Sequence, residues 1–306
     1  MLHNAIRILN FDNSITSQVG LLSSFQHQIL ELSDLAGGLR LFGNEKTARL
    51  LTERIRKTDN CAPTFLGSGD FHHVSQVLIN CQPEIRSVII FDFHPDWDIL
   101  PPHFGCGSWV SRLLKNKNIE KCVLIGVSSN DLCSFALQSA DLSALKDNRL
   151  EIYPWRHNPS RVCFREVPSN ISLRTKNWFF SKKIYWEQLE NINLDYFINQ
   201  LIKRLPEGKV YISIDKDCLS RPYALTNWEE GFLQLDQLLF FLNKLKVLDI
   251  AGLDITGDYS QLKFPSRFKA ILSRLDHPGV KTPICEESAR LINQETNLKI
   301  LKTLGF

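Results

Sequence analysis

The sequence FDFHPDWD, residues 91–98, follows the apolar run Ser87-Val-Ile-Ile90. Its alternate positions hold acidic or imidazole side chains, namely Asp92, His94, Asp96 and Asp98. Because alternate side chains of a strand point to one face, these groups would lie close together. So many ionisable groups on one face repel one another unless a cation lies among them. The stretch therefore predicts a buried strand that ends in a metal site.

The rest of the chain alternates between short apolar runs and longer segments of helical period. The predicted strands are Ala5–Leu9, Thr64–Leu66, Ser87–Phe93, Lys121–Val127, Leu150–Tyr153, Lys209–Ile214 and Leu248–Ile255. The predicted helices are Gln18–Leu32, Asn44–Lys57, Val74–Asn80, Gly107–Lys115, Leu194–Arg204 and Leu233–Leu245. This alternation favours a mostly parallel sheet that is covered by helices on both faces. We expect a single domain over residues 1–306, with an irregular excursion at 155–187, where no clean period is kept.

The composition is that of an ordinary globular protein, with 43% hydrophobic and 23% charged residues. The net charge of +3 is mild, so we expect neither nucleic acid nor a membrane surface as a partner. The eight cysteines form no C-x-x-C pair, which indicates buried thiols in a reducing compartment. No apolar run reaches roughly 18 residues, and the N-terminus lacks the order of a signal peptide. We therefore expect a cytoplasmic protein.

Two further clusters of polar side chains also follow predicted strands. In SIDKDCLS, residues 213–220, Asp215 and Asp217 stand two apart, and Lys216 between them should point to the other face. In LGSGDFHHVS, residues 66–75, glycines allow a tight turn from which a histidine can reach the sheet. Ligands gather at the carboxyl ends of parallel strands. We therefore expect the three clusters to form one metal site.

The combined ligand set is rich in carboxylates and contains one or two imidazoles. Such a set suits Mn²⁺ best, with Fe²⁺, Co²⁺ or Zn²⁺ as alternatives. Up to four aspartates and two histidines are more than one ion needs, and they fit two divalent ions roughly 3.5–4 Å apart. Two such ions lower the pKa of a bridging water and generate hydroxide near neutral pH. The implied chemistry is hydrolysis.

In order and spacing, the three clusters resemble the arginase/agmatinase (ureohydrolase) superfamily, whose pattern is G-G-D-H-S, then D-A-H-x-D, then S-x-D-x-D-x-x-D-P. The segment AGLDITGDYS, residues 251–260, is similar to the family's late strand G-L-D-I-x-E-x-N-P. The resemblance runs from about residue 60 to about residue 260. It implies a three-layer α/β/α fold around a mostly parallel sheet, a small-molecule substrate and, commonly, a homo-oligomer.

The resemblance also implies a ligand set, carried over residue by residue. Asp92 and Asp215 would bridge two Mn²⁺ ions. The remaining ligands would be Asp96 with a histidine for one ion, and His94 with Asp217 for the other.

The histidine that completes the first site has two candidates. An inserted Phe71 separates the aspartate of the motif from His72 and His73, so the alignment leaves the choice open. His73 is favoured, because it directly precedes the predicted helix, as the family's histidine does.

Three positions around the site depart from the family's pattern. Gly257 stands where the family has a glutamate that grips the guanidinium group, with Asp258 beside it. Cys106 stands at the family's loop histidine, and His103, three residues earlier, is a substitute for it. Asp98 stands where arginases have an asparagine for the substrate's α-carboxylate, and a carboxylate there favours an amine.

These departures indicate a metal-dependent hydrolase of C–N bonds, of the guanidino or amide type, that acts on an amine-bearing substrate rather than a true arginase. Asp96 would relay a proton to the leaving amine, and Cys106 or His103 would shuttle protons or line the pocket. The residues expected to bind substrate are Asp98, Asp258, Glu229 and Glu230.

Two alternatives stay open at this point. A deacetylase-like amidohydrolase would keep the fold and use one zinc ion, but such enzymes usually lack the second carboxylate of D-x-H-x-D, which is Asp96 here. A binding or regulatory protein would keep the metal site without turnover. The altered recognition positions favour that second alternative, and the intact ligand set opposes it.

Overall fold

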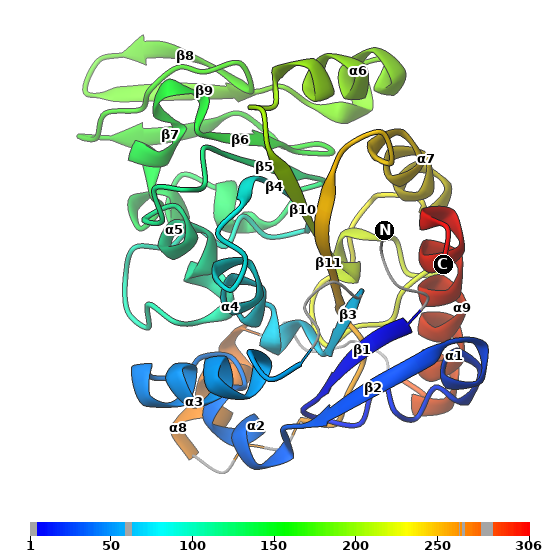
Figure 1. The fold of residues 1–306 in the computed structure, drawn as a ribbon. Helices are drawn as coiled ribbons and strands as arrows, with labels where there is room; N and C mark the ends of the chain where they lie inside the picture. The colour runs from blue at the N-terminus through cyan, green and yellow to red at the C-terminus, as the bar shows by residue number, and fades with distance from the viewer. Residues whose placement is uncertain (1–4, 59–62, 263, 265–266, 277–283) are drawn as a thin grey trace.

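The central feature of the fold is an eight-stranded parallel sheet, seen in a computed structural model that describes residues 5–58, 63–262, 264, 267–276 and 284–306 (Figure 1). The strand order is β2-β1-β3-β11-β10-β4-β5-β6. The strands are β1 (Ala5–Asn10), β2 (Gln26–Glu31), β3 (Thr64–Gly67), β4 (Ile85–Phe91), β5 (Lys121–Ile125), β6 (Leu150–Tyr153), β10 (Lys209–Asp215) and β11 (Ile250–Thr256). The predicted parallel sheet is confirmed.

Helices cover both faces of this sheet and make the fold three-layered. On one face lie α2 (Ser33–Leu39), α3 (Glu45–Ile55), α4 (Val74–Asn80) and α5 (Trp109–Leu113). On the other lie α1 (Val19–Ser24), α6 (Leu194–Arg204), α7 (Leu235–Leu245) and α9 (Glu286–Leu304). The ammonium of Lys269, on α8 (Arg267–Asp276), donates to carbonyls at the end of α2. None of the described helices has the length and apolarity needed to cross a membrane.

The apolar run before the metal cluster is buried on both sides, as predicted. In β4, Val88 and Ile90 belong to the core under α2–α5, whereas Ile89 and Phe91 belong to the core under α6, α7 and α9. Burying one such side chain stabilises the fold by roughly 1.5–3 kcal/mol. Because β10 and β5 flank β4 in register, this strand is held firmly where its carboxyl end meets the site.

Two expectations about local structure were wrong. The predicted helix Gln18–Leu32 ends at Ser24, and Gln26–Glu31 instead forms the edge strand β2, paired in parallel with β1. Pairing with a neighbouring strand overrides the local helical period there. The predicted strand Ser87–Phe93 ends at Phe91. Residues 92–98 form a loop in which Asp96 has φ of +47°, so their alternation does not arise from a strand.

The segment 155–187 is more regular than expected. It contains β7 (Ser160–Cys163), β8 (Leu173–Trp178) and β9 (Ser181–Trp186), which form an antiparallel sheet in the order β7-β9-β8. The inner face of this small sheet buries Val162, Leu173 and Ile184 in the core. Short strands with one buried face give a two-residue period too brief to be recognised among so many charged residues.

Candidate metal centre

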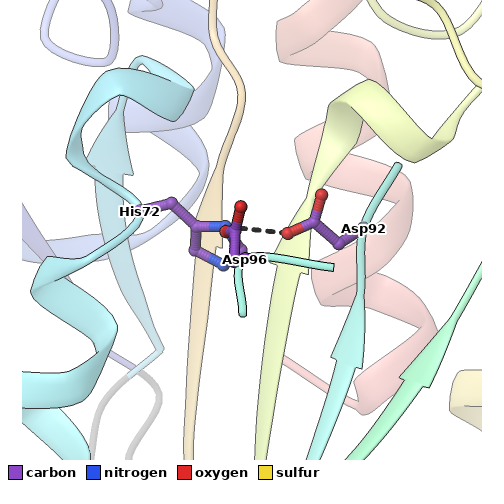
Figure 2. A group of neighbouring side chains, drawn as sticks. All are labelled: His72, Asp92 and Asp96. Carbon is purple, nitrogen blue, oxygen red and sulfur yellow. Dashed lines mark ion pairs between the residues drawn. The ribbon is translucent and has the colours of Figure 1, made fainter. Parts of the chain in front are cut away.

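The site lies where β3, β4 and β10 end, because these parallel strands direct their following loops to one edge of the sheet. Two groups of side chains there could each hold a metal ion, with ligand atoms within 4.8 Å of one another in each group. One group is His72, Asp92 and Asp96, shown in Figure 2, and the other is Asp92, His94 and Asp217. Because Asp92 belongs to both, the two groups are adjacent.

Asp215, at the end of β10, joins the first group. Its Oδ2 lies 3.6 Å from Nδ1 of His72, and its Oδ1 accepts a hydrogen bond from the backbone N–H of Asp217 at 3.0 Å. Asp96 is fixed differently, because the indole N–H of Trp109 donates to its Oδ2 at 2.7 Å. The structure therefore brings the imidazole of His72 from one sequence cluster and the carboxylates of the other two clusters to one point.

The hydrogen bonds of Ser213 determine which nitrogen of His72 carries a proton. The hydroxyl of Ser213 donates to the buried carboxylate of Asp254 at 2.7 Å, and Asp254 also accepts from the hydroxyl of Tyr211 at 2.8 Å. A serine has one proton to donate, so its oxygen accepts from Nε2 of His72, which lies 2.9 Å away. Nδ1 of His72 is then the nitrogen that faces the carboxylates. Burial lowers the pKa of His72, but Asp92 and Asp96 outweigh burial and raise this pKa well above its usual range, so without a metal ion Nδ1 is protonated.

This arrangement crowds three carboxylates around one imidazole nitrogen in a buried place. Nδ1 of His72 lies 3.1 Å from Oδ2 of Asp92, and that oxygen has no hydrogen-bond partner among the described residues. Without a cation, burial raises the pKa of Asp92 well above its usual range, and the charges of Asp96 and Asp217 raise it further. Burial and the charge of Asp217 likewise raise the pKa of Asp215 to about 8. A divalent cation would satisfy these groups, so the donor set fits a metal ion.

Both nitrogens of His94 contact carboxylates. Nδ1 lies 2.9 Å from Oδ2 of Asp217, and Nε2 lies 2.9 Å from Oε2 of Glu229. Burial lowers the pKa of His94, but the two carboxylates outweigh burial and raise this pKa well above its usual range. If a metal ion takes Nδ1, Nε2–H can donate to Glu229, which would hold the ring in place.

The preference for His73 over His72 is not supported by the geometry. His73 is fully buried, its ring lies 4.7 Å from that of Phe104, and neither of its nitrogens has a hydrogen-bond partner among the described residues. Burial lowers the pKa of His73 to about 3, so the imidazole is neutral. The turn Gly69–Phe71 rotates the chain so that His72 faces the carboxylates and His73 packs behind them.

A cavity of about 510 Å³ opens beside these histidine and aspartate side chains, a size that suits a small molecule. Asp98 and Cys106 line this cavity, as predicted, and so does Glu229. Two lining residues that sequence reasoning missed are Asp131 and Trp228. Neither belongs to a recognisable motif: Asp131 lies in a single turn of 3-10 helix, Asn130–Leu132, and Trp228 in an irregular loop, and only the tertiary fold brings them to the site.

Three residues expected at the site do not line this cavity. His103 is exposed at a loop surface, and Glu230 pairs with Arg221 at 3.1 Å. Asp258 is buried on the opposite side of β10, where its carboxylate lies 2.8 Å from the ammonium of Lys216. Lys216 does point away from Asp215 and Asp217, as expected, and this is why Asp258 cannot reach the substrate cavity.

Gly257 is required by the backbone next to the ligands. Its φ is +86°, and a Cβ at this position would lie 2.4 Å from Oδ1 of Asp215 and 2.7 Å from the backbone nitrogen of Lys216. No side chain fits there. The backbone therefore leaves no room for the glutamate that the resemblance implied at this position.

Comparisons with solved structures identify the fold. An arginase from Bacillus subtilis superimposes with a TM-score of 0.57 at 13% identity, covering 98% of this chain and 97% of that chain. A formimidoylglutamase from Bacillus subtilis gives a TM-score of 0.57 at 13% identity, covering 98% and 85%. The arginase of Entamoeba histolytica, solved in complex with L-ornithine, gives 0.55 at 10% identity, covering 100% and 99%. The protein thus has the fold of the arginase/ureohydrolase superfamily.

Sequence comparisons add little to this identification. An uncharacterised protein of Thermotoga maritima is 26% identical over 221 residues, which are 70% of this chain and 68% of that protein. No family model matches the sequence. Among solved arginases and related hydrolases the identity is low, so this chain is a divergent form of the fold with a cluster of histidine and aspartate that could bind metal.

Proposed function

We propose that the protein is a metal-dependent hydrolase of non-peptide C–N bonds that acts on an amine-bearing guanidino or amide compound. The observation that carries this proposal is the charge of the cavity. Its lining includes the carboxylates of Asp92, Asp96, Asp98, Asp131, Asp215, Asp217 and Glu229. Among the described residues that line it, none is a lysine or an arginine. Two divalent cations would offset only part of this negative charge, so a cationic substrate is favoured.

The proposed ligands are His72, Asp92, Asp96 and Asp215 for one ion, and Asp92, His94, Asp215 and Asp217 for the other. This carboxylate-rich set suits Mn²⁺, with Zn²⁺, Fe²⁺ or Co²⁺ as alternatives. When bound, such ions supply an activated water near neutral pH and positive charge at the carbon under attack.

The protein's own groups would orient the substrate and handle the proton. Asp98 lies at the cavity wall, where the hydroxyl of Ser139 donates to its Oδ1 at 3.0 Å, and its Oδ2 faces the cavity near Gly107. It would bind the substrate's amine, with Glu229 as a second anionic contact near the ligands. Asp96 would relay a proton to the leaving amine, and the indole of Trp109 keeps its Oδ2 in position.

A metal-binding protein without turnover is the alternative, and Gly257 is the observation that favours it. A guanidinium group is best held by a carboxylate that accepts its fork of donors, and no side chain fits at this position. Glu229, which lines the cavity, would have to supply that carboxylate.

The test is hydrolysis of three compounds by Mn²⁺-loaded protein, measured as released urea for the two guanidino compounds and as released acetate for the amide. These are agmatine, which has no carboxylate, arginine, which has one, and an N-acetylated diamine. We expect turnover of an amine-bearing compound without a carboxylate at a higher kcat/KM than arginine. Asp215→Ala should lose both metal and activity, and retention of two ions by this variant would contradict the ligand assignment. If the wild type binds two ions and hydrolyses none of these classes, the binding alternative replaces the enzyme.

A further inference from the structure

Charge is distributed unevenly along this chain. Residues 155–187 contain seven Lys or Arg and two Glu, although the whole chain has a net charge of only +3. The rest of the molecule is therefore net acidic. The expectation that no membrane surface is a partner rested on the net charge of the whole chain. That net charge does not reveal the basic segment 155–187.

The register of the small sheet places its cations directly opposite one another. Arg161 on β7 pairs with Lys183 on β9, and Lys183 pairs with Lys176 on β8. Directly paired residues share a face, and neighbouring Val162 and Ile184 are buried on the other face. These cations therefore form a row across the outer face of the sheet. Like charges in this position destabilise a sheet, so the row needs an explanation beyond folding.

Arg174 extends this row, and the four residues Arg161, Arg174, Lys176 and Lys183 are called the cationic face below. Arg174 stands two residues before Lys176 on the same side of β8 and is exposed. The strands β7, β8 and β9 contain no Asp or Glu. Within the described part of the chain, no carboxylate forms an ion pair with a residue of the cationic face, whereas Lys182 on the inner side pairs with Glu166. The cationic face is therefore available to an external anion.

Large apolar side chains lie at the turn end of the same sheet. Phe164, Phe179 and Phe180 are 87%, 92% and 79% exposed, and Trp178 is 50% exposed. These four residues form the aromatic tip. The rings of Phe164 and Phe180 are stacked 6.3 Å apart, and the guanidinium of Arg161 lies 6.0 Å from the ring of Trp178. The contact between Arg161 and Trp178 joins the aromatic tip to the cationic face, and the small sheet that carries both lies beyond β6 at one end of the molecule (Figure 1).

Two of these aromatic residues occupy positions that favour glycine or asparagine. Phe164 has φ of +56° and Phe179 has φ of +47°. A bulky side chain in this left-handed region is uncommon. The chain accepts strain at both turns and, in return, projects two phenylalanine rings outwards. Unfavourable backbone conformations at two such positions, with no gain in core packing, are typical of a surface that binds a partner.

We propose that this sheet docks the protein onto a membrane surface that contains anionic phospholipid. The aromatic tip would enter the interface between headgroups and acyl chains, with Trp178 at the headgroup level. The cationic face would then lie against the lipid phosphates. A bilayer fits this shape better than a nucleic acid does. The tip is apolar and projecting, whereas base stacking uses aromatic rings set along a groove that tracks a charged backbone.

The experiment measures sedimentation with vesicles of phosphatidylcholine alone and of phosphatidylcholine with about 30% phosphatidylserine. We expect binding to the anionic vesicles that weakens as salt rises. The double variant Lys176→Gln/Lys183→Gln should bind on the order of 25-fold more weakly, at about fivefold for each cation near the surface. Phe179→Ser/Phe180→Ser should also weaken binding, on the order of tenfold or more. In the wild type, Trp178 emission should shift to the blue.

The matched control is Lys115→Gln/Lys117→Gln, which removes two exposed cations after α5, far from the small sheet in sequence. It should bind anionic vesicles as the wild type does. All variants should keep the wild-type Tm, because the altered side chains are on the surface. The proposal is overturned if the wild type ignores anionic vesicles at low salt, or if the control loses as much binding as the sheet variants. Binding of an oligonucleotide or self-association through the aromatic tip, in place of vesicle binding, also overturns it.

Discussion

Oγ of Ser213 lies 2.9 Å from Nε2 of His72, on the side of the imidazole away from the carboxylates. Because the hydroxyl of Ser213 donates its hydrogen bond to Asp254, the serine oxygen accepts from Nε2–H of His72. The contact with His72 therefore fixes the tautomer of the neutral ring in which Nδ1 is free to bind a cation. Ser213 itself need never touch a metal ion or a substrate. It positions the ligand, and its contribution should be visible in metal affinity.

Ser213→Ala should therefore weaken binding of the first metal ion by about 10–100-fold, the usual effect of losing a group that orients a ligand. Titration against a competing chelator measures this directly. Ser87→Ala is the control, since Ser87 is a fully buried strand residue whose hydroxyl has no hydrogen-bond partner among the described residues. Equal metal affinities for the two variants would contradict the assigned tautomer.

Replacing His72 and His73 one at a time should have opposite effects on metal content. His72→Ala removes a nitrogen that faces three carboxylates, so we expect loss of at least one ion. His73→Leu removes a buried imidazole with no described hydrogen-bond partner, so metal content and Tm should be retained or improved. Elemental analysis of the two purified variants decides between them. The reverse pattern would restore His73 as the ligand.

Metal-free protein should become less stable as pH rises. Burial and the charge of Asp217 raise the folded-state pKa of Asp215 from its ordinary value of 3.8 to about 8, so the native state binds more protons between these pH values. The stability from this group is present below about pH 4 and is lost as pH rises through 8. The raised pKa values of His72 and His94 act in the same direction. Unfolding in chelator at several pH values tests this, and Mn²⁺ should stabilise the protein most at the upper end.

Gly257→Ala should disrupt the site more than the same change elsewhere. The new Cβ would clash with Asp215, so we expect loss of metal affinity in addition to the roughly 1–2 kcal/mol cost of a left-handed alanine. Gly305→Ala is the control, because its φ is +95° and nothing lies within 4 Å of the added Cβ. The variant Gly305→Ala should lose stability but keep the metal affinity of the wild type. Gly257→Glu should likewise fail to create arginase activity, and a gain of that activity would refute the steric argument.

Asp98 should control activity on a cationic substrate at mildly acidic pH. Burial raises the pKa of its carboxyl to about 6, so this group becomes neutral as pH falls through that value. We expect kcat/KM for an amine-bearing substrate to fall in the same range. Asp98→Asn should lower kcat/KM at neutral pH. It should also remove the fall of kcat/KM on the acidic side of the pH profile. An unchanged profile would exclude Asp98 from substrate binding.

The sequence predicts the sheet well, because the sheet depends on the local order of apolar and polar residues. Apolar runs such as Val88–Ile90 can only be buried strands, and the residues after them must emerge at the same edge. The antiparallel sheet of 155–187 and the edge strand β2 could not be predicted, since pairing with distant segments determines them.

The choice between His72 and His73 shows more clearly what the sequence cannot predict. A single turn of 3-10 helix, Gly69–Phe71, decides which of two adjacent imidazoles faces Asp92. No pattern in the sequence specifies that rotation. Asp258 was misplaced for a similar reason. It follows the end of β11 and the left-handed Gly257, and no pattern in the sequence shows that its carboxylate turns towards Lys216.

The edge strand β2 has a consequence for self-assembly. Gln26, His27, Gln28 and Glu31 are exposed along it. Extending the sheet across two copies at this border would bury amide, imidazole and carboxylate groups with little apolar surface in return. A homo-oligomer of this protein would therefore be assembled through another surface, and the sheet would end at β2.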